Sequence, residues 1–208
     1  MIVHPIGMMR ATAASGFSFS DDFGSTYHTL GDALTVSGLY TNVSGFRPIK
    51  SKDSGGTRVA AQDLGTTQDE LITYTDETVP DARKVSLTVR QFRDGDAGHV
   101  FRMYAAYADA DNYVLVQRDT GGYVKIVHRS SATDNINVDI LGAMPTVGTV
   151  SVELNGTSMA VKVAGSHIGA SPYTVPSVTG YGPPGLFQKM TGTTTISTEF
   201  SLFEIEEL

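Results

Sequence analysis

Two alternating runs on either side of Asn155-Gly156 constrain the fold of this chain more than any other stretch. The segment 150–165 reads VSVELNGTSMAVKVAG, and every second residue in each run is apolar. A period of two places one side of a strand in a core and the other side in water. Asn-Gly is favoured in tight hairpin turns because both residues tolerate a positive φ. We therefore predict an antiparallel hairpin that turns at Asn155-Gly156, or a longer loop that includes Thr157 and Ser158.

Alternation of this kind recurs along most of the chain. The 22 glycines and many Thr and Val residues also favour strands and tight turns over helices. We predict strands at 17–23, 37–43, 58–62, 70–75, 84–92, 98–106, 113–118, 123–129, 135–141, 150–154, 159–163, 186–189 and 194–206. The polar segment Ser51–Gly56 is predicted to be a turn, and Ser166–Gly169 to prolong its strand after a bulge at Gly165. Hairpin following hairpin indicates one antiparallel β-sandwich or jelly roll.

Composition excludes several classes of function. The sequence has no cysteine, so disulfide frameworks, thiolate metal sites and cysteine nucleophiles are ruled out. The net charge is −7, and the scattered Lys and Arg residues form no basic stripe. Nucleic acids and anionic membranes are therefore not expected partners. No apolar run reaches the roughly 18 residues that a membrane helix needs.

The first sixteen residues read MIVHPIGMMRATAASG and have no clear period. A secretory signal is disfavoured because the apolar part is short, is broken by Pro5 and Gly7, and precedes Arg10. We expect residues 1–16 to be an arm in front of a domain at 17–208. The arm either packs on its own domain or attaches to other proteins of an assembly or to copies of this chain.

Three stretches of the sequence carry a family resemblance. They are Asp21-Asp22-Phe23, the passage from Gly98 to Leu115 that contains VFR and DADNYVL, and the hairpin at 150–165 followed by PGLF at 184–187 and FEI at 203–205. Together they resemble the concanavalin A-like lectin/glucanase jelly roll, in particular its laminin-G-like and keto-disaccharide-hydrolase-like branches. The resemblance implies an all-β, antiparallel two-sheet jelly-roll sandwich.

Domains of this family without cysteine occur in structural proteins of tailed phages. The resemblance therefore implies a non-enzymatic virion component, assembled in the host cytoplasm, with a surface glycan as a candidate ligand. Two alternatives stay open. One is a secreted or cell-surface carbohydrate-binding protein, and the less favoured one is a glycoside hydrolase.

Acidic residues in one predicted turn offer a candidate metal site. Asp109, Asp111 and Asn112 could place three oxygens around Ca²⁺, a cation that takes six to eight oxygen ligands. The alternative is a turn capped by its own side chains. Asp94 and Asp96 allow the same comparison with a weaker case. We expect no resident cofactor, with Ca²⁺ the sole candidate.

Tyrosines concentrate in the same part of the chain. Tyr104, Tyr107, Tyr113 and Tyr123 are the candidate ligand-binding residues, because tyrosine on a sheet face can stack on a sugar ring or fill a protein interface. The alternative is that they pack within the core or on a sheet face.

No catalytic residue is nominated. Glycoside hydrolysis needs two carboxylates that flank the scissile bond. Glu204, Glu206 and Glu207 offer only an E-x-E-E pattern at the C-terminal end, and Glu153 stands alone on its strand. The five histidines are scattered and no G-x-S-x-G motif exists, so a serine triad is not expected either.

Asp21 and Asp22 would lie near Glu204 or Glu206 if the first and last strands pair. We expect these two aspartates to be solvated residues at a strand end.

Overall fold

The computed structural model describes residues 16–45, 48–62, 68–76, 78–92, 100–119, 123–141, 147–177, 180–190 and 198–208. The expected arm lies outside these ranges except for Gly16, and so do Asp94 and Asp96. No helix within them is long and apolar enough to span a membrane.

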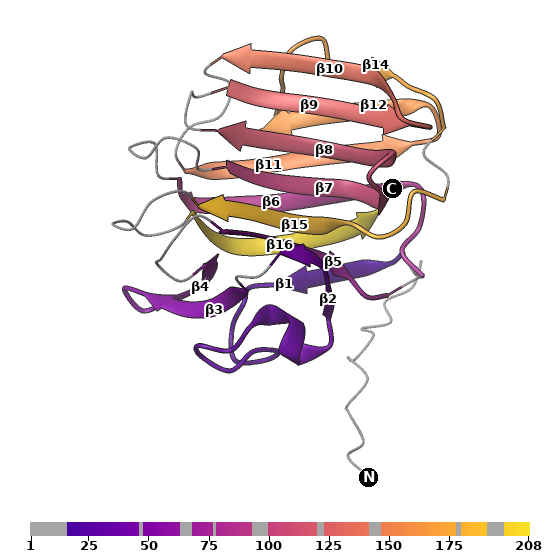
Figure 1. Cartoon of the computed structure of the whole chain (residues 1–208). Coiled ribbons are helices and arrows are strands. Elements are labelled where there is room, and N and C mark those ends of the chain that lie inside the picture. The colour runs from indigo at the N-terminus through magenta and orange to yellow at the C-terminus, as the bar shows by residue number, and fades with distance from the viewer. Residues whose placement is uncertain are drawn as a thin grey trace.

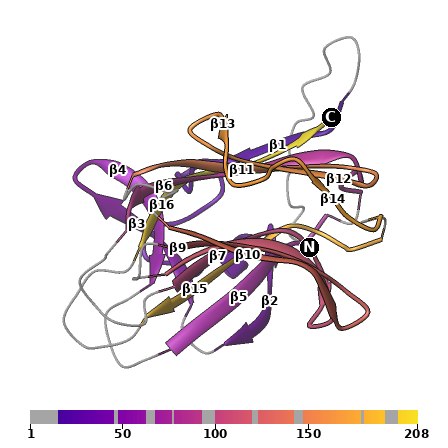
Figure 2. The same cartoon turned by 90° about the horizontal axis from the view of Figure 1, so that it is seen from above.

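Two antiparallel sheets pack face to face, as Figures 1 and 2 show from the front and from above. The seven-stranded sheet has the order β10 (Thr133–Leu141), β9 (Tyr123–Ser130), β8 (Asn112–Asp119), β7 (Val100–Asp109), β15 (Gly185–Met190), β5 (Gln68–Tyr74) and β2 (Tyr40–Gly45). The nine-stranded sheet has the order β13 (Ser166–His167), β12 (Ser158–Val163), β11 (Gly148–Asn155), β6 (Arg83–Gln91), β16 (Glu199–Glu207), β4 (Thr57–Gln62) and β3 (Ile49–Ser54). β1 (Ser18–Asp21) pairs with β16, β14 (Tyr173–Thr174) pairs with β12, and a short 3₁₀ helix, η1, covers Leu34–Ser37. The predicted all-β, antiparallel two-sheet sandwich is confirmed.

The core lies between the two sheets and follows from the alternation in the sequence. Val85, Leu87 and Val89 of β6 are fully buried on one side of their strand. Across the sandwich, Phe101 and Met103 of β7 are fully buried in the same cluster. Each sheet therefore keeps one face for the core and leaves the other to solvent.

The hairpin at 150–165 forms as predicted, but its turn lies one residue further along. Asn155 pairs with Ser158, so the two turn residues are Gly156 and Thr157. Gly156 has a φ of 57°, which suits the first turn position. This register sets Leu154 opposite Met159, and both are fully buried. Core pairing of the apolar residues thus decides which residues form the turn.

Two sequence predictions near turns are wrong. Ser51–Gly56 was expected to be a turn, but β3 runs to Ser54 and only the two glycines turn. Ser51 lies fully buried in β3, where its hydroxyl donates to the Phe23 carbonyl at 2.8 Å. Ser166–Gly169 does not prolong β12 past a bulge. Ala164 and Gly165 both have positive φ, and β13 folds back to pair with β12.

The first and last strands pair, with Ser20 opposite Glu204. The expectation that Asp21 is solvated is wrong, since it is fully buried at this junction. One carboxylate oxygen accepts hydrogen bonds from the Tyr40 hydroxyl and from His28 Nε2, each at 2.8 Å, and the other accepts from the Phe23 amide. Asp22 is exposed as expected. The buried group ties the first strand to the segment that leads into β2.

Candidate functional site

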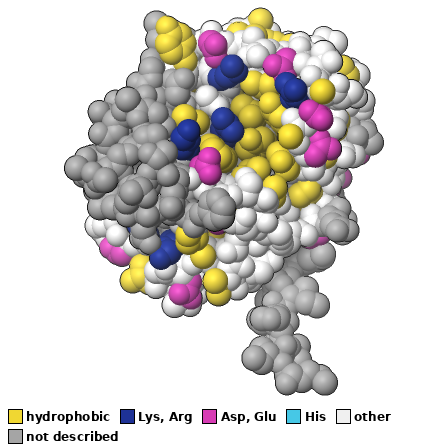
Figure 3. Space-filling model, in the orientation of Figure 1, with side chains coloured by type: hydrophobic (Ala, Val, Ile, Leu, Met, Phe, Trp, Pro, Cys, Tyr) yellow, Lys and Arg dark blue, Asp and Glu magenta, His cyan; other side chains and the backbone are white. Residues whose placement is uncertain are grey.

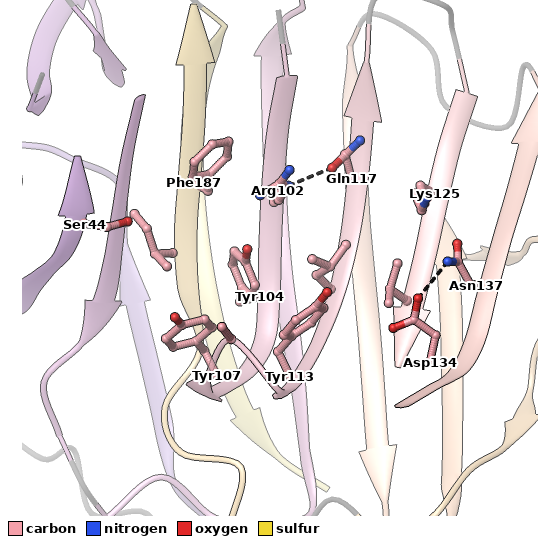
Figure 4. A pocket seen from close by; sticks show the side chains of 14 residues that line it. Ser44, Arg102, Tyr104, Tyr107, Tyr113, Gln117, Lys125, Asp134, Asn137 and Phe187 are labelled. Atoms are coloured by element: carbon pink, nitrogen blue, oxygen red, sulfur yellow. Dashed lines mark hydrogen bonds between the residues drawn. The ribbon is translucent and has the colours of Figure 1, made fainter. Parts of the chain in front are cut away.

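The outer face of the seven-stranded sheet carries a hollow of about 520 Å³. Apolar side chains gather over this sheet, with cationic and acidic side chains beside them (Figure 3). The lining residues come from all seven strands and from the β7–β8 turn (Figure 4). They are Ser44, Leu71, Arg102, Tyr104, Tyr107, Ala110, Tyr113, Leu115, Gln117, Lys125, Val127, Asp134, Asn137 and Phe187.

Strand register arranges most of these side chains in three rows across the sheet. The first row is Phe187, Arg102, Gln117 and Lys125, and the second is Tyr104, Leu115, Val127 and Asn137. The third is Tyr107, Tyr113 and Asp134, with Arg129, which is not a lining residue, between the last two. Residues opposite each other on neighbouring strands lie on the same face. The hollow is therefore built on sheet backbone rather than on loops, and its side chains have fixed neighbours.

The floor of the hollow is a second apolar cluster, separate from the main core. It consists of Leu71, Tyr104, Leu115, Val127 and Phe187, each no more than 7% exposed. Their side chains lie on the outer face of the seven-stranded sheet, where they pack against one another and are largely covered. The floor is therefore a packed apolar layer, and a ligand in the hollow would lie on it.

Three tyrosines stand together at one end of the hollow. The ring of Tyr104 meets that of Tyr107 at 5.1 Å between centroids and that of Tyr113 at 5.8 Å, both edge to face. A bulge in β7 makes this possible, because the pairing passes from Tyr104–Leu115 to Ala106–Val114. The extra residue turns Tyr107 to the same side as Tyr104. Burial raises the pKa of Tyr107 and of Tyr113 above the ordinary value for tyrosine.

Polar groups occupy the other end and the β10 side. The Arg102 guanidinium carbon lies 4.4 Å from the centroid of the Phe187 ring, and its Nε donates to Gln117 Oε1 at 2.7 Å. On β10, Asp134 accepts from the Arg129 guanidinium at 2.8 Å and from the Asn137 side-chain Nδ2 at 2.9 Å. The hollow thus combines aromatic surface with amide, guanidinium and ammonium donors.

Three of the four predicted ligand-binding tyrosines meet here. Tyr104, Tyr107 and Tyr113 line the hollow, whereas Tyr123 does not. Tyr123 lies two residues before Lys125 on the same face of β9 and is 43% exposed. Whether any of the four contacts a ligand stays a prediction.

Four residues beside these tyrosines were not among the predicted site residues. They are Arg102, Gln117, Lys125 and Phe187, and the first two alternate with core residues on their strands. Alternation alone could have placed them on the outer face. Their meeting depends on the pairing of β15 with β7, which no local pattern in the sequence indicates.

The candidate calcium ligands lie at the tip of the β7–β8 hairpin. Asp109 Oδ1 accepts from the Asp111 amide at 2.8 Å and from the Asn112 side chain at 3.0 Å, while Asn112 Oδ1 accepts from the Ser131 amide. The hydrogen bond from the Asp111 amide lowers the pKa of Asp109. No group of three or more acidic or His side chains in the described ranges could hold a metal. The geometry is that of a capped turn, and Ca²⁺ binding stays a prediction.

Two of the acidic residues considered for catalysis, Glu153 and Glu206, face away from the hollow. Glu153 pairs with Lys162 at 2.7 Å and Glu206 pairs with Lys84 at 2.8 Å. These two glutamates and their two lysine partners all belong to the nine-stranded sheet, on the side opposite its buried valines. These carboxylates are therefore on the far face of the sandwich from the aromatic hollow.

No protein family model and no curated protein match the sequence. Solved structures do match it. The exoplasmic/lumenal domain of VIP36 with Ca²⁺ and Man3GlcNAc bound has a TM-score of 0.60 at 8% identity, over 82% of this chain and 84% of that one. A β-glucanase from Bacillus licheniformis has a TM-score of 0.58 at 10% identity, over 92% and 98%. A carbohydrate-binding module, CBM66 from Bacillus subtilis, has 0.50 at 14% identity, over 79% and 91%.

Identities this low show a shared fold and leave the activity open. The two antiparallel sheets, their order and these structural matches agree with the resemblance found in the sequence. The chain adopts the concanavalin A-like jelly-roll fold.

Proposed function

We propose that this chain is a non-catalytic glycan-binding domain and that the hollow on the seven-stranded sheet is its binding surface. The observation that carries the proposal is the three-tyrosine group over an apolar floor, next to Arg102 and Gln117. The C–H face of a sugar ring packs on aromatic side chains, and its hydroxyls bond to side chains that donate and accept. Two structural neighbours support the proposal, one with Man3GlcNAc bound and one named a carbohydrate-binding module.

The acidic groups of the hollow support a non-catalytic role. Asp134 is the one carboxylate among the described residues that line it, and it is held by Arg129 and Asn137. Hydrolysis of a glycosidic bond needs a second carboxylate across the bond. A carboxylate engaged with two donors at the rim suits fixed recognition better than proton transfer.

We also propose that the domain acts in adhesion on a tailed-phage particle, with residues 1–16 attaching to other virion proteins or to copies of this chain. Support comes from the cysteine-free sequence and from the family resemblance. A secreted or cell-surface carbohydrate-binding protein is the alternative. Deletion of residues 1–16 should leave a folded domain that no longer joins its particle. Normal incorporation of the shortened chain would remove the arm from the proposal.

Glycan binding is tested by a broad array probed with the purified chain, followed by titration of the best ligand. Tyr113→Ala should weaken binding by about tenfold or more, because the ring is part of the stacking surface. The matched control is Tyr27→Ala, which removes a tyrosine that is 38% exposed and lies outside the hollow. Absence of binding to every glycan on the array, or an equal loss of affinity in both variants, would contradict the proposed site.

A further inference from the structure

Two cations in the hollow have no acidic partner. Arg102 and Lys125 line it from β7 and β9, and neither forms an ion pair with a carboxylate in the described part of the chain. By contrast, Lys84, Arg129 and Lys162 are each paired with a carboxylate at 2.8 Å or less. The chain as a whole carries a net charge of −7. An acidic protein that leaves two cations together on an aromatic surface has a local charge that a ligand can neutralise.

The geometry of Arg102 leaves one edge of its guanidinium for a ligand. One face of the group stacks on Phe187, and Nε donates to Gln117. The two terminal nitrogens have no hydrogen-bond partner among the described residues. A guanidinium held in this way offers two parallel donors, the arrangement that binds a carboxylate or sulfate group in bidentate fashion.

Lys125 extends the positive region along the same row. Gln117 lies opposite Arg102 on one side and opposite Lys125 on the other, so the two cations are two strands apart. Neighbouring strands are about 4.8 Å apart, which separates the two backbones by roughly 10 Å. Asp139 lies opposite Lys125 on β10 without an ion pair, and Asp134 is engaged by Arg129. The row suits an extended ligand that carries negative groups along its length.

We propose that the glycan bound in the hollow is anionic, with carboxylate or sulfate groups on its sugar rings. The inference rests on the proposed glycan-binding function. In this arrangement the tyrosines pack against sugar rings, and Arg102 and Lys125 bind the acidic groups. The site therefore selects against the neutral counterpart of the same polymer, which would leave both cations desolvated without an anion.

The test is affinity measurement on the full chain with two matched pairs of polymers: polygalacturonate against its methyl ester for carboxylate, and dextran sulfate against unmodified dextran for sulfate. We expect at least one acidic polymer to bind tenfold or more tightly than its neutral counterpart, with an affinity that falls as NaCl is added. Arg102→Gln and Lys125→Gln should each weaken that binding by roughly ten- to a hundredfold, the range for a charge-assisted hydrogen bond. Arg102→Lys should restore part of it.

Lys84→Gln is the matched control, because it removes one positive charge from the outer face of the other sheet. Circular dichroism and thermal unfolding show whether each variant is folded, and Lys125→Gln is informative even if Arg102→Gln is not. Equal affinity for neutral and acidic polymers, with binding still dependent on Tyr113, overturns the inference and leaves the proposed function intact. Equal weakening by Lys84→Gln and Lys125→Gln also overturns it. Failure to bind any glycan overturns both.

Discussion

The two solvent-facing sides of the sandwich share one core and differ in what they show to water. On the nine-stranded sheet the outer side has small residues, such as Ser86 and Ser151, that are buried among their neighbours. Charged side chains on this face pair with each other, as Lys162 does with Glu153. On the seven-stranded sheet the outer face has an apolar floor, three tyrosines and two cations without acidic partners. The alternation that builds the core is the same in both sheets. The two faces differ in the outward-facing residues that alternate with the core residues. Those residues place the candidate site on the seven-stranded sheet.

The largest expected effect is on the free energy of unfolding, and it differs between the shared core and the outer apolar cluster. Leu87→Ala should lower the free energy of unfolding by about 2–5 kcal/mol, because it opens a cavity between the sheets. Leu115→Ala, in the outer cluster, should cost less because the site borders solvent and refills with water, but it should weaken glycan binding. Chemical denaturation and titration of both variants measure this. Equal loss of stability would mean that the outer cluster is part of the fold rather than a binding floor.

The next effect concerns the aromatic end of the hollow. Tyr107→Ala combined with Tyr113→Ala should reduce affinity for the array's best glycan by roughly a hundredfold, because both rings present exposed stacking surface. The stability of this double variant should change little relative to that of Leu87→Ala. If affinity is retained, the tyrosines are packing residues of the sheet face, and they do not make the seven-stranded face a glycan-binding surface.

The stability of the fold should depend on pH through a histidine that lies beneath the hollow. His128 is fully buried on the inner side of β9, stacked on Tyr181 at 5.6 Å between ring centroids. Burial lowers the pKa of His128 below 6.5, so in acid the unfolded chain takes up the proton more readily than the folded chain. Stability should therefore fall as the pH drops below about 6.5, by up to about 1.4 kcal/mol per pH unit for one proton.

Denaturation curves across this range compare the parent chain with His128→Gln, whose slope should be flatter. The same slope in both chains would assign the acid sensitivity to other groups.

The smallest effect belongs to the charged pairs of the nine-stranded sheet. Lys162→Gln breaks the contact with Glu153, and both side chains are about a quarter exposed. Such a pair contributes less than about 1 kcal/mol. We expect a change of that size in thermal unfolding and no change in glycan affinity. A clear loss of affinity would show that the two faces are not functionally distinct.

Much of the fold could be predicted because alternation is a local signal. The buried positions 85, 87 and 89 and the hairpin at 150–165 follow from it directly. Asp21 was misjudged because its partners, His28 and Tyr40, lie 7 and 19 residues away, and no local pattern marks a carboxylate that will be buried. β3 was missed because its buried Ser51 is polar and has a distant partner.

The candidate site could be predicted only in part. Tyr104 alternates outward, but strict alternation would turn Tyr107 inward, and only the bulge brings it outward. The stacking of Arg102 on Phe187 joins residues 85 positions apart through strand pairing. Residue types and their alternation predict where the strands are and which side chains face inward or outward. The order of strands in the sheet then decides which side chains meet.

The most direct test of the account maps where a glycan binds. An ¹⁵N-labelled chain is titrated with a trisaccharide of the polymer that binds most tightly, and amide shifts are followed by NMR. We predict that the largest shifts cluster on β7, β8, β9 and β15, around Tyr104 and Gln117, while the amides of β6, β11 and β12 stay unchanged. Shifts centred on the outer face of the nine-stranded sheet, around Ser151, would contradict the assignment of the binding surface.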